Sequence, residues 1–309
     1  MTMKNAQIHR KSLGKRIVAS WQLYVLLLPA LVFFGVFRYA PLYGIQIAFR
    51  DYMPRMGIWG SEWIGLENFE RFFNGFNFTT LLSNTIILAV LQLIVNFPVP
   101  IILALFMNYI KNQKFKHATQ LIVYAPYFIS TVVLVGMLNV FFSLDGLVNQ
   151  IIQHLGGSPI LFLNMESTFR PMYVFSDVWQ TMGWNSIIYL AALSGVSPEL
   201  HEAALVDGAN KFQRVFHIDI PHILPTVVIM LILNVGMIMS LGFEKAYLMQ
   251  NDLNLGKSEI IATYVYKIGL IDGQYGFSTA VDIFNSVINL ILLLSVNKIS
   301  AKLSGSSLW

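Results

Sequence analysis

Apolar residues along this chain gather into six long runs that polar segments separate. A helix needs about 20 mostly apolar residues to cross the hydrocarbon core of a membrane. The runs cover 21–37, 81–110, 119–142, 172–193, 223–243 and 277–297. We therefore predict an all-α membrane protein whose six transmembrane helices occupy 21–297, between a basic arm over 1–20 and a tail over 298–309.

The second run carries Pro98 and Pro100 in its interior. A proline inside a helix lacks the N–H that the next hydrogen bond requires, and it bends the helix. Lipid tolerates such a break only where neighbouring helices cover the freed backbone groups. We expect this span to be kinked and packed inside a bundle.

Positive charge divides the connecting segments into two sides. Lys and Arg are about twice as dense on one side as on the other, and the positive-inside rule makes the denser side cytoplasmic. That side comprises 1–20, 111–118, 194–222 and 298–309, so both termini face the cytoplasm. The outer side comprises 38–79, 143–171 and 244–276. No small-residue cleavage site follows the first apolar run, so we interpret 1–20 as an uncleaved basic arm that lies on anionic membrane lipid.

Composition agrees with a membrane location. Hydrophobic residues make up 56% of the 309 residues, charged residues make up 12%, and the mean hydropathy is +0.62. Soluble domains contain about 25% charged residues, so the composition argues against a soluble enzyme. The chain has no cysteine, which excludes disulfides, thiolate nucleophiles and cysteine-ligated metal sites.

Partial motifs for catalysis fail on spacing. Residues 256–258 (Gly-Lys-Ser) match the end of a phosphate-binding loop, but Asn251 stands where that loop needs glycine. Residues 201–202 (His-Glu) begin like a zinc-protease helix, yet Leu205 stands where the second histidine belongs. We therefore predict a chain that is not an enzyme, with no catalytic residue, no metal site, no cofactor of its own and no nucleic-acid partner.

The segment 197–225, between spans 4 and 5, has the pattern of a compact helical knob. Ser197 is a good N-cap, Pro198 fits the first helical position, and Gly208 is a natural helix stop. We expect a second short helix over 209–217. Two prolines then end it before span 5: Pro221 and Pro225.

This knob resembles a known motif. The sequence has Glu202-Ala203-Ala204, Gly208 after three residues, and Ile218-Asp219-Ile220-Pro221 after nine more. That spacing is similar to the E-A-A-x3-G-x9-I-x-L-P loop of ABC-importer permeases, with isoleucine for leucine as the one departure. The resemblance implies that the knob docks on a separate cytoplasmic ATPase subunit, which uses ATP and Mg. The residues it would assign to coupling are Glu202, Ala203, Ala204, Asp207, Gly208, Ile218 and Pro221.

Three further segments resemble carbohydrate permeases of the maltose-transporter class and its LplB-type branch: 38–52, 65–69 and 305–309. The resemblance implies a multi-pass permease domain in a bacterial plasma membrane. It implies import of an oligosaccharide, which in this branch can be acidic or derived from a polysaccharide. It also implies a heterodimer with a second permease, two ATPase subunits and an extracellular solute-binding lipoprotein. A permease for another solute stays open as the alternative.

Polar residues inside the spans are candidates for a sugar pathway, because they are costly in lipid and usually face a cavity. Ser278 and three residues after it lie on one face of span 6, at helical spacing. Amide, carboxylate and aromatic side chains suit sugar hydroxyls and ring faces. The candidates are Asp177, Trp179, Gln180, Asn185, Tyr189, Asn234, Ser240, Asp282, Asn285 and Asn289. The alternative is hydrogen bonding between helices that holds the bundle together.

Aromatic residues crowd the outer segment 42–79. Trp59 and Trp63 are candidates for docking the binding protein, since aromatic side chains anchor protein interfaces. The alternative is an aromatic belt at the membrane interface. A different class of function, an ion-driven secondary transporter with Asp177 and Asp282 as proton sites, would need matched broken helices, and only span 2 carries the paired prolines.

Overall fold

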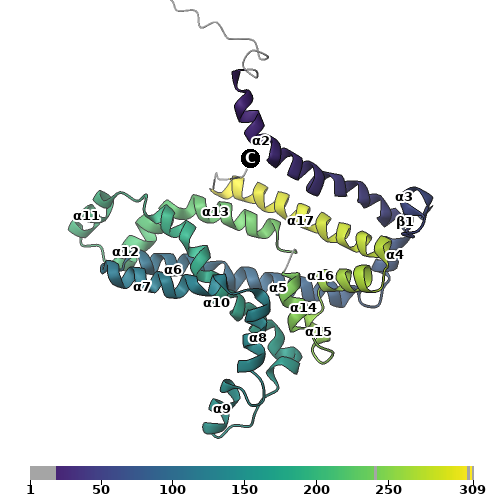
Figure 1. Cartoon of the computed structure of the whole chain (residues 1–309). Coiled ribbons are helices and arrows are strands. Elements are labelled where there is room, and N and C mark those ends of the chain that lie inside the picture. Colours follow the sequence, from purple (N-terminus) through teal and green to yellow (C-terminus); the bar gives the residue numbers. More distant parts are fainter. Residues whose placement is uncertain (1–18, 240–241, 305–306, 308–309) are drawn as a thin grey trace, which may run out of the picture.

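The computed structural model describes residues 19–239, 242–304 and 307, and helices account for most of them (Figure 1). Most of the long helices run side by side. The helix α11 (Pro198–Val206) lies at one end of the bundle and α4 (Glu67–Phe73) at the other. We call these the α11 end and the α4 end.

The first helical stretch is longer than its apolar run. Helical turns follow one another from Trp21 to Phe49, whereas we expected the span to end at residue 37. Pro41 does not stop the helix because it lies in the first turn of the last segment, where its missing N–H costs little. The segments are α2 (Trp21–Phe34), η1 (Gly35–Tyr39) and η2 (Ala40–Phe49).

The two halves of this stretch have different neighbours. The segment η2 packs against the last helix, α17 (Tyr275–Ser304), whereas α2 buries none of its residues. The apolar side chains of α2 are exposed; Leu26, for example, is 77% exposed. A helix that is apolar all round fits lipid or the surface of another membrane helix.

A small hairpin follows at the α4 end. The strand β1 (Arg50–Asp51) pairs antiparallel with β2 (Glu62–Trp63), and α3 (Gly57–Gly60) lies in the loop between them. The Asn68 side chain of α4 donates to the backbone oxygens of Ala48 and Arg50, at 2.9 and 3.3 Å. These bonds hold the hairpin against the end of the first span.

The prolines of span 2 act where the sequence predicted. The helix α5 (Phe78–Asn96) ends two positions before the first proline, and α6 (Pro98–Asn108) begins on that proline. The two helices still form one apolar span of 31 residues. The break at Phe97 therefore kinks the span without turning the chain back.

Span 3 is not the single helix over 119–142 that we expected. Its two parts meet at 99°. The backbone is extended at Ile129 and Ser130, and the Ser130 hydroxyl accepts from the N–H of Val133 as the cap of the new helix. A serine cap after a proline turn outweighs the apolar run. The elements are α7 (Gln113–Tyr124), η3 (Ala125–Phe128) and α8 (Thr131–Phe141).

The helix α10 (Glu166–Leu193) lies at the centre of the bundle. It packs against α5, α6, α7 and η3, and against elements that follow it in the chain. Its Gln180 side chain donates to the free carbonyl of Ile129 at 2.7 Å, and Trp184 stacks on Tyr127 with the ring centroids 4.5 Å apart. The bend of span 3 is therefore covered by α10. Two short elements precede it: α9 (Leu147–His154) and η4 (Phe162–Asn164).

Helical conformation runs from Lys211 to Gly236, through both prolines that we expected to end the second helix of the knob. Pro221 lies in the first turn of α13, where its N–H is not needed, and a π-turn before it widens the helix. The predicted end of span 5 at residue 243 was also wrong, because the helix ends at Gly236. The elements are α12 (Lys211–Arg214), η5 (Val215–Asp219) and α13 (Ile220–Gly236).

The chain after span 5, which we expected to be an outer loop over 244–276, folds back into the bundle instead. Lys245 is 4% exposed, and Asn254 and Ser258 are 1% and 0% exposed. The elements are α14 (Phe243–Met249), α15 (Leu255–Ser258), α16 (Ile261–Tyr266) and η6 (Lys267–Ile271).

Four described helical stretches are long and apolar enough to span a membrane, and the bent pair α7–α8 is a fifth candidate. The helix α10 has 28 residues, about 42 Å at the usual rise. This helix is long enough to span a membrane, but its polar residues make it less apolar than the stretches named above. The chain is thus an all-α, multi-pass membrane protein.

Gly183 tests the packing of α10 against the bend of span 3. A Cβ at Gly183 would collide with the backbone carbonyl of Val123 in α7. We expect Gly183→Ala to lower the free energy of unfolding by about 1–3 kcal/mol, as overpacking does, measured by thermal unfolding in detergent. Gly136→Ala is the control, because a Cβ there meets nothing within 4 Å. Equal stability of the two variants would contradict this packing.

Candidate functional site

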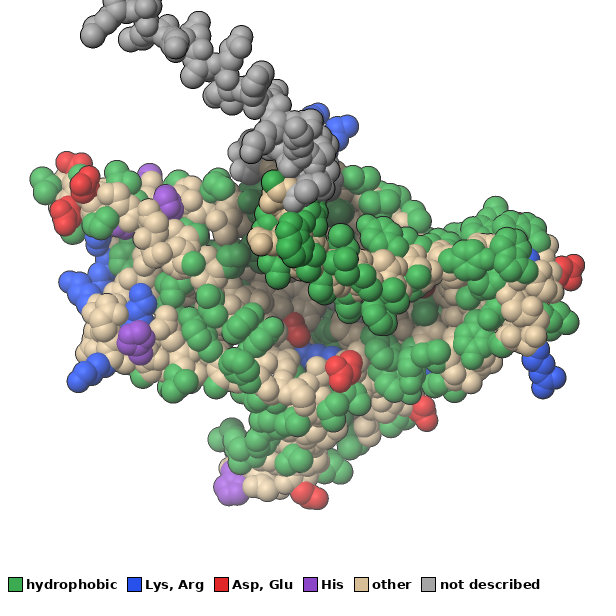
Figure 2. All heavy atoms as spheres, turned by 45° about the horizontal axis from the view of Figure 1, so that its top comes forward, with side chains coloured by type: hydrophobic (Ala, Val, Ile, Leu, Met, Phe, Trp, Pro, Cys, Tyr) green, Lys and Arg blue, Asp and Glu red, His purple; other side chains and the backbone are tan. Residues whose placement is uncertain are grey.

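A cavity of about 500 Å³ lies in the middle of the bundle. The helices α5, α6, α10, α13 and α14 line it, and Figure 2 shows a hollow near the centre of the molecule in which acidic and basic side chains are visible. Its polar lining residues are Gln92, Asn96, Thr131, Tyr173, Asp177, Gln180, Asn185, Tyr189, Asn234, Glu244 and Lys245. Polar groups that gather around a cavity between membrane helices are typical of a transport pathway.

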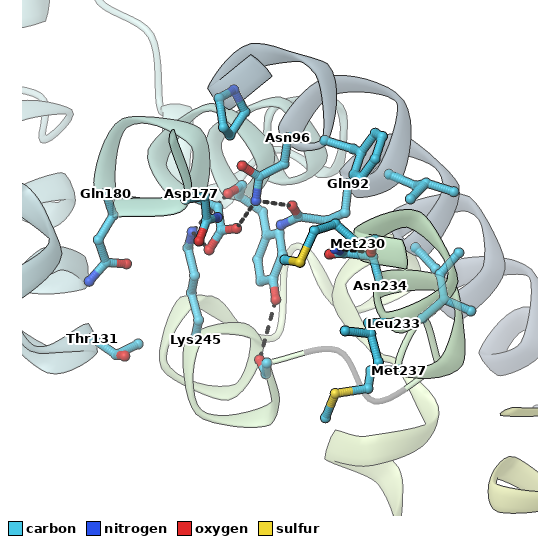
Figure 3. Close-up of a pocket in the computed structure, with 18 of the residues that line it drawn as sticks. Gln92, Asn96, Thr131, Asp177, Gln180, Met230, Leu233, Asn234, Met237 and Lys245 are labelled. Carbon is cyan, nitrogen blue, oxygen red and sulfur yellow. Dashed lines mark hydrogen bonds and ion pairs between the residues drawn. The ribbon is translucent and has the colours of Figure 1, made fainter. Parts of the chain in front are cut away.

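An ion pair joins two walls of the cavity (Figure 3). The Lys245 ammonium lies 3.2 Å from Oδ1 of Asp177 and donates to the backbone oxygen of Tyr173 at 2.9 Å. It also lies 4.7 Å from the centroid of the Tyr173 ring. A buried ammonium requires a partner of this kind, so the pair fixes α14 against α10.

Asn96 completes the network from the third wall. Its side-chain nitrogen donates to Oδ2 of Asp177 at 2.7 Å and to Gln92 at 3.3 Å, and its oxygen accepts from Thr181 at 3.2 Å. Asn96 is the last residue of α5, directly before the proline break. The break therefore brings an amide into contact with the ion pair.

The wall formed by α13 is partly apolar. Met230, Leu233 and Met237 lie beside Asn234, whose side-chain nitrogen donates to the backbone oxygen of Met230 at 2.8 Å. Thioether and aliphatic groups beside amides offer surface for sugar C–H groups and partners for hydroxyls.

The predicted pathway residues fall into two sets. Five line the cavity: Asp177, Gln180, Asn185, Tyr189 and Asn234. Four do not: Trp179, Asp282, Asn285 and Asn289. Ser240 lies outside the described residues.

The polar face of α17 has another role in this structure. Asn289 accepts from the N–H of Met239 at 2.9 Å, and Asn285 donates to the oxygen of the same residue at 3.3 Å. Both amides therefore satisfy the backbone where span 5 ends, as in the helix–helix alternative. Asp282 is exposed on the same helix.

Six polar residues of the cavity were not predicted from the sequence: Gln92, Asn96, Thr131, Tyr173, Glu244 and Lys245. Lys245 was assigned to an outer loop because it follows the last apolar residue of span 5. A cue for Asn96 was present: it is one of the few polar residues in the second run, and it stands two positions before Pro98.

The knob stands at the α11 end, as Figure 1 shows, and most of its surface is uncovered. Gly208 has a φ of +80°, which lets α11 turn sharply into α12. Ser197 takes the N-cap position without the side-chain bond that we expected. Glu202, Ala203, Asp207, Gly208 and Pro221 are exposed, whereas Ala204 and Ile218 are half-buried.

One side chain of the knob reaches a buried carboxylate. His201 of α11 lies 3.2 Å from Asp219, which also accepts from the Tyr109 hydroxyl at 2.7 Å. Burial, followed by the accepting Asp219 carboxylate, raises the pKa of Tyr109 to about 12. This tyrosine lies just beyond the end of span 2, and its hydroxyl stays protonated as a donor at neutral pH.

The two tryptophans at the α4 end flank one arginine. The Arg50 guanidinium lies 5.6 Å from the ring centroid of Trp59 and 5.4 Å from that of Trp63. Trp63 also stacks on Phe49, and the two indoles are 73% and 60% exposed. The arginine therefore fixes two large exposed aromatic groups in one patch.

A helical bundle with a polar cavity at its centre and an exposed helical knob at one end is the architecture of a membrane transport permease. Figure 2 shows hydrophobic side chains spread over much of the face, whereas basic, histidine and acidic side chains gather at the α11 end.

Comparison with known proteins agrees. Residues 97–305 match the family described as binding-protein-dependent transport system inner membrane component, and the chain belongs to this family. This match confirms the family that the sequence of the knob indicated. The family consists of transporter permeases and not of enzymes. The chain is a permease of the ABC-importer class.

Two relatives come from Bacillus subtilis (strain 168). Protein LplB is 43% identical over 93% of this chain and 91% of its own length. The polygalacturonan/rhamnogalacturonan transport system permease protein YteP is 42% identical over 97% and 94%. A solved bacterial ABC transporter involved in the import of the acidic polysaccharide alginate has a chain with a TM-score of 0.88 and 36% identity, over 95% of this chain and 100% of that one.

The contribution of the Lys245–Asp177 ion pair to the free energy of unfolding can be tested. Lys245→Met leaves the Asp177 carboxylate without its cation and should cost about 3 kcal/mol, since Asp177 is 23% exposed and partly screened. The double variant with Asp177→Asn should recover part of this loss, as measured by unfolding in detergent. Lys267→Met is the control, because the side chain of Lys267 is 29% exposed, against 5% for that of Lys245, and its pair with Glu259 should contribute less than about 1 kcal/mol. Additive losses in the double variant would show that the two groups do not interact.

Proposed function

We propose that this permease forms one half of an alternating-access pathway for an oligosaccharide. The observation that carries the proposal is the central cavity, where amide, tyrosine and thioether side chains from α5, α10 and the α13 wall surround one neutralised ion pair. Such a surface offers donors and acceptors to hydroxyl groups and apolar area to sugar rings. The names of its relatives supply the class of cargo.

We infer that acidic oligosaccharides derived from polysaccharides are the first cargo to test. One relative at 42% identity carries polygalacturonan and rhamnogalacturonan in its name, and the structural relative belongs to an importer of alginate. The only lysine or arginine lining the described part of the cavity is Lys245. The other half of the pathway, from a second permease, would add its own groups.

The proposed membrane topology has six spans, with both termini in the cytoplasm. The helix α10 is the additional span: its polar residues face neighbouring helices or the cavity and not lipid, which explains its low hydropathy. This places the knob in the cytoplasm and the Trp59–Trp63 patch outside, in line with the density of Lys and Arg along the sequence.

The knob is the proposed docking site for a partner ATPase. Its uncovered apolar side chains include Leu205, Val206 and Phe212, which are 55%, 87% and 77% exposed. Exposed apolar groups of this size in a compact segment mark an interaction surface. When ATP binding closes a pair of ATPase subunits, the docked knob moves as a lever and the spans change from inward-facing to outward-facing. Hydrolysis then resets the cycle.

Val206 gives the decisive experiment. The full importer is purified, reconstituted in liposomes with its binding protein, and assayed for ATP-dependent uptake of labelled oligosaccharides, acidic and neutral. Val206→Asp places a charge in the docking surface. It should reduce both the amount of ATPase subunit that stays bound to the permease and the rate of uptake at least tenfold, which corresponds to about 1.4 kcal/mol or more. Leu155→Asp is the control, since Leu155 is also exposed, at 82%, but lies beside α9.

The result separates the candidate functions. Uptake that needs ATP and is lost with Val206→Asp supports an ABC-importer half. Uptake driven by an ion gradient with no ATPase present would instead favour a secondary transporter and remove the role of the knob.

The proposed binding-protein contact is the Trp59–Trp63 patch. Truncation of either indole to alanine should weaken binding of the extracellular protein about tenfold or more, because buried tryptophans dominate such interfaces. The measurement is the Kd of the cargo-loaded binding protein for the importer in nanodiscs. Trp21→Ala is the matched control, since Trp21 is 60% exposed, as Trp63 is, but lies near the other end of span 1. Unchanged affinity in both patch variants would refute docking at these residues.

A further inference from the structure

Asp219 is a charged residue with a fully buried side chain at the α11 end. Its exposed fraction is 0%, and it closes the π-turn η5 directly before α13. Neither its burial nor its partners follow from the coupling motif, in which its position carries no fixed residue type. A carboxylate in such a place requires polar partners from its surroundings. Tyr109 donates a hydrogen bond to one of its oxygens, and His201 lies at ion-pair distance from the other.

The first partner comes from span 2. The Tyr109 hydroxyl donates to Oδ2 of Asp219 at 2.7 Å. Tyr109 caps the end of α6, and the Arg214 guanidinium lies 5.7 Å from the centroid of its ring. The carboxylate therefore ties the start of the α13 span to the end of span 2.

The second partner comes from the knob. Nε2 of His201 lies 3.2 Å from Oδ1 of Asp219, and the His201 ring packs edge-on against Tyr109 with the centroids 6.4 Å apart. In α11 every described residue is exposed apart from His201 and Ala204. His201 is thus the polar side chain of α11 that turns away from solvent and towards the spans.

We propose that Asp219 is the joint that transmits movement of the knob to the spans. His201 and Tyr109 are positioning residues that act through it. This rests on the proposed role of the knob as the ATPase contact. A helix joined to the bundle only by its backbone ends can tilt without moving the spans. A helix joined through a buried carboxylate carries α6 and α13 with it.

Single substitutions at the joint test this. Tyr109→Phe removes one hydroxyl and keeps the ring, and His201→Ala removes the imidazole. In the reconstituted importer we expect both variants to assemble and to hydrolyse ATP at half the wild-type rate or more. The amount of cargo taken up per ATP should fall at least fivefold. His201→Gln keeps a donor near Oδ1 and should restore much of the ratio.

The control is His154→Ala. The His154 ring likewise makes one hydrogen bond, to the backbone oxygen of Gln150, but on α9, away from the knob. Its ratio of cargo to ATP should match the wild type.

The outcomes are distinct. If the amount of cargo taken up per ATP is unchanged in Tyr109→Phe and His201→Ala, the proposed joint is wrong. It is also wrong if assembly, hydrolysis and uptake all fall together in both variants while the cargo taken up per ATP stays the same, since that pattern marks a purely structural role. If Asp219→Asn does not assemble, Tyr109→Phe decides, because it changes one atom. Failure of the proposed function itself looks different: the wild-type importer would then show no ATP-dependent uptake.

Discussion

Hydrocarbon offers no hydrogen-bond partner, so each backbone group that a broken helix frees must be satisfied by the protein itself. The architecture of this permease follows from that constraint. The bend of span 3 exposes the carbonyl of Ile129, and Gln180 of α10 donates to it. The end of span 5 exposes both polar groups of Met239, and two amides of α17 bond them. Further along, Asn84 of α5 donates to the carbonyls of Gly256 and Glu259, in the segment that folds back into the bundle. In these three places, a polar side chain of a neighbouring helix bonds the backbone groups that are not paired within a helix.

The same constraint explains where the polar residues of the chain lie. A helix that serves as the partner of several breaks cannot be apolar, and α10 is the clearest case. Tyr173 and Gln180 of α10 bond the backbone oxygens of Gly242 and Ile129, and both also line the cavity. The cavity exists where the breaks converge: Asn96 precedes the proline break of span 2, and Lys245 follows the end of span 5. The side chains that bond freed backbone groups therefore also line the cavity. A polar residue in a span is for this reason not by itself evidence of contact with cargo.

The two ends of the molecule differ, as we expect of a transporter on which ATPase subunits act at one end only. At the α4 end, Arg50 holds two exposed indoles in a rigid patch beside a short hairpin. At the α11 end, an exposed knob turns on Gly208 and meets the spans at a buried carboxylate. Between them, the cavity is held together by an ion pair that joins α10 to α14. In the proposed mechanism, displacement of the knob reaches this region through α6 and α13, both of which line the cavity.

The sequence by itself determined the class of this protein. Long apolar runs required a membrane, the proline pair in span 2 located the break, and the spacing from Glu202 to Pro221 identified the family, because these signals depend on local composition alone. Tertiary structure decided the rest. The run over 119–142 is mostly apolar, so its mean hydropathy did not reveal that a serine cap would bend it by 99° against α10. The sequence placed Lys245 in a loop. In the structure, the chain after span 5 folds inward and pairs Lys245 with Asp177, which lies 68 residues earlier. Asn285 and Asn289 shared a face with Asp282 in sequence, yet only the neighbouring helix determined that they bond backbone and do not line the cavity. A side chain's partner depends on which helices lie beside it, and hydropathy carries no information about that.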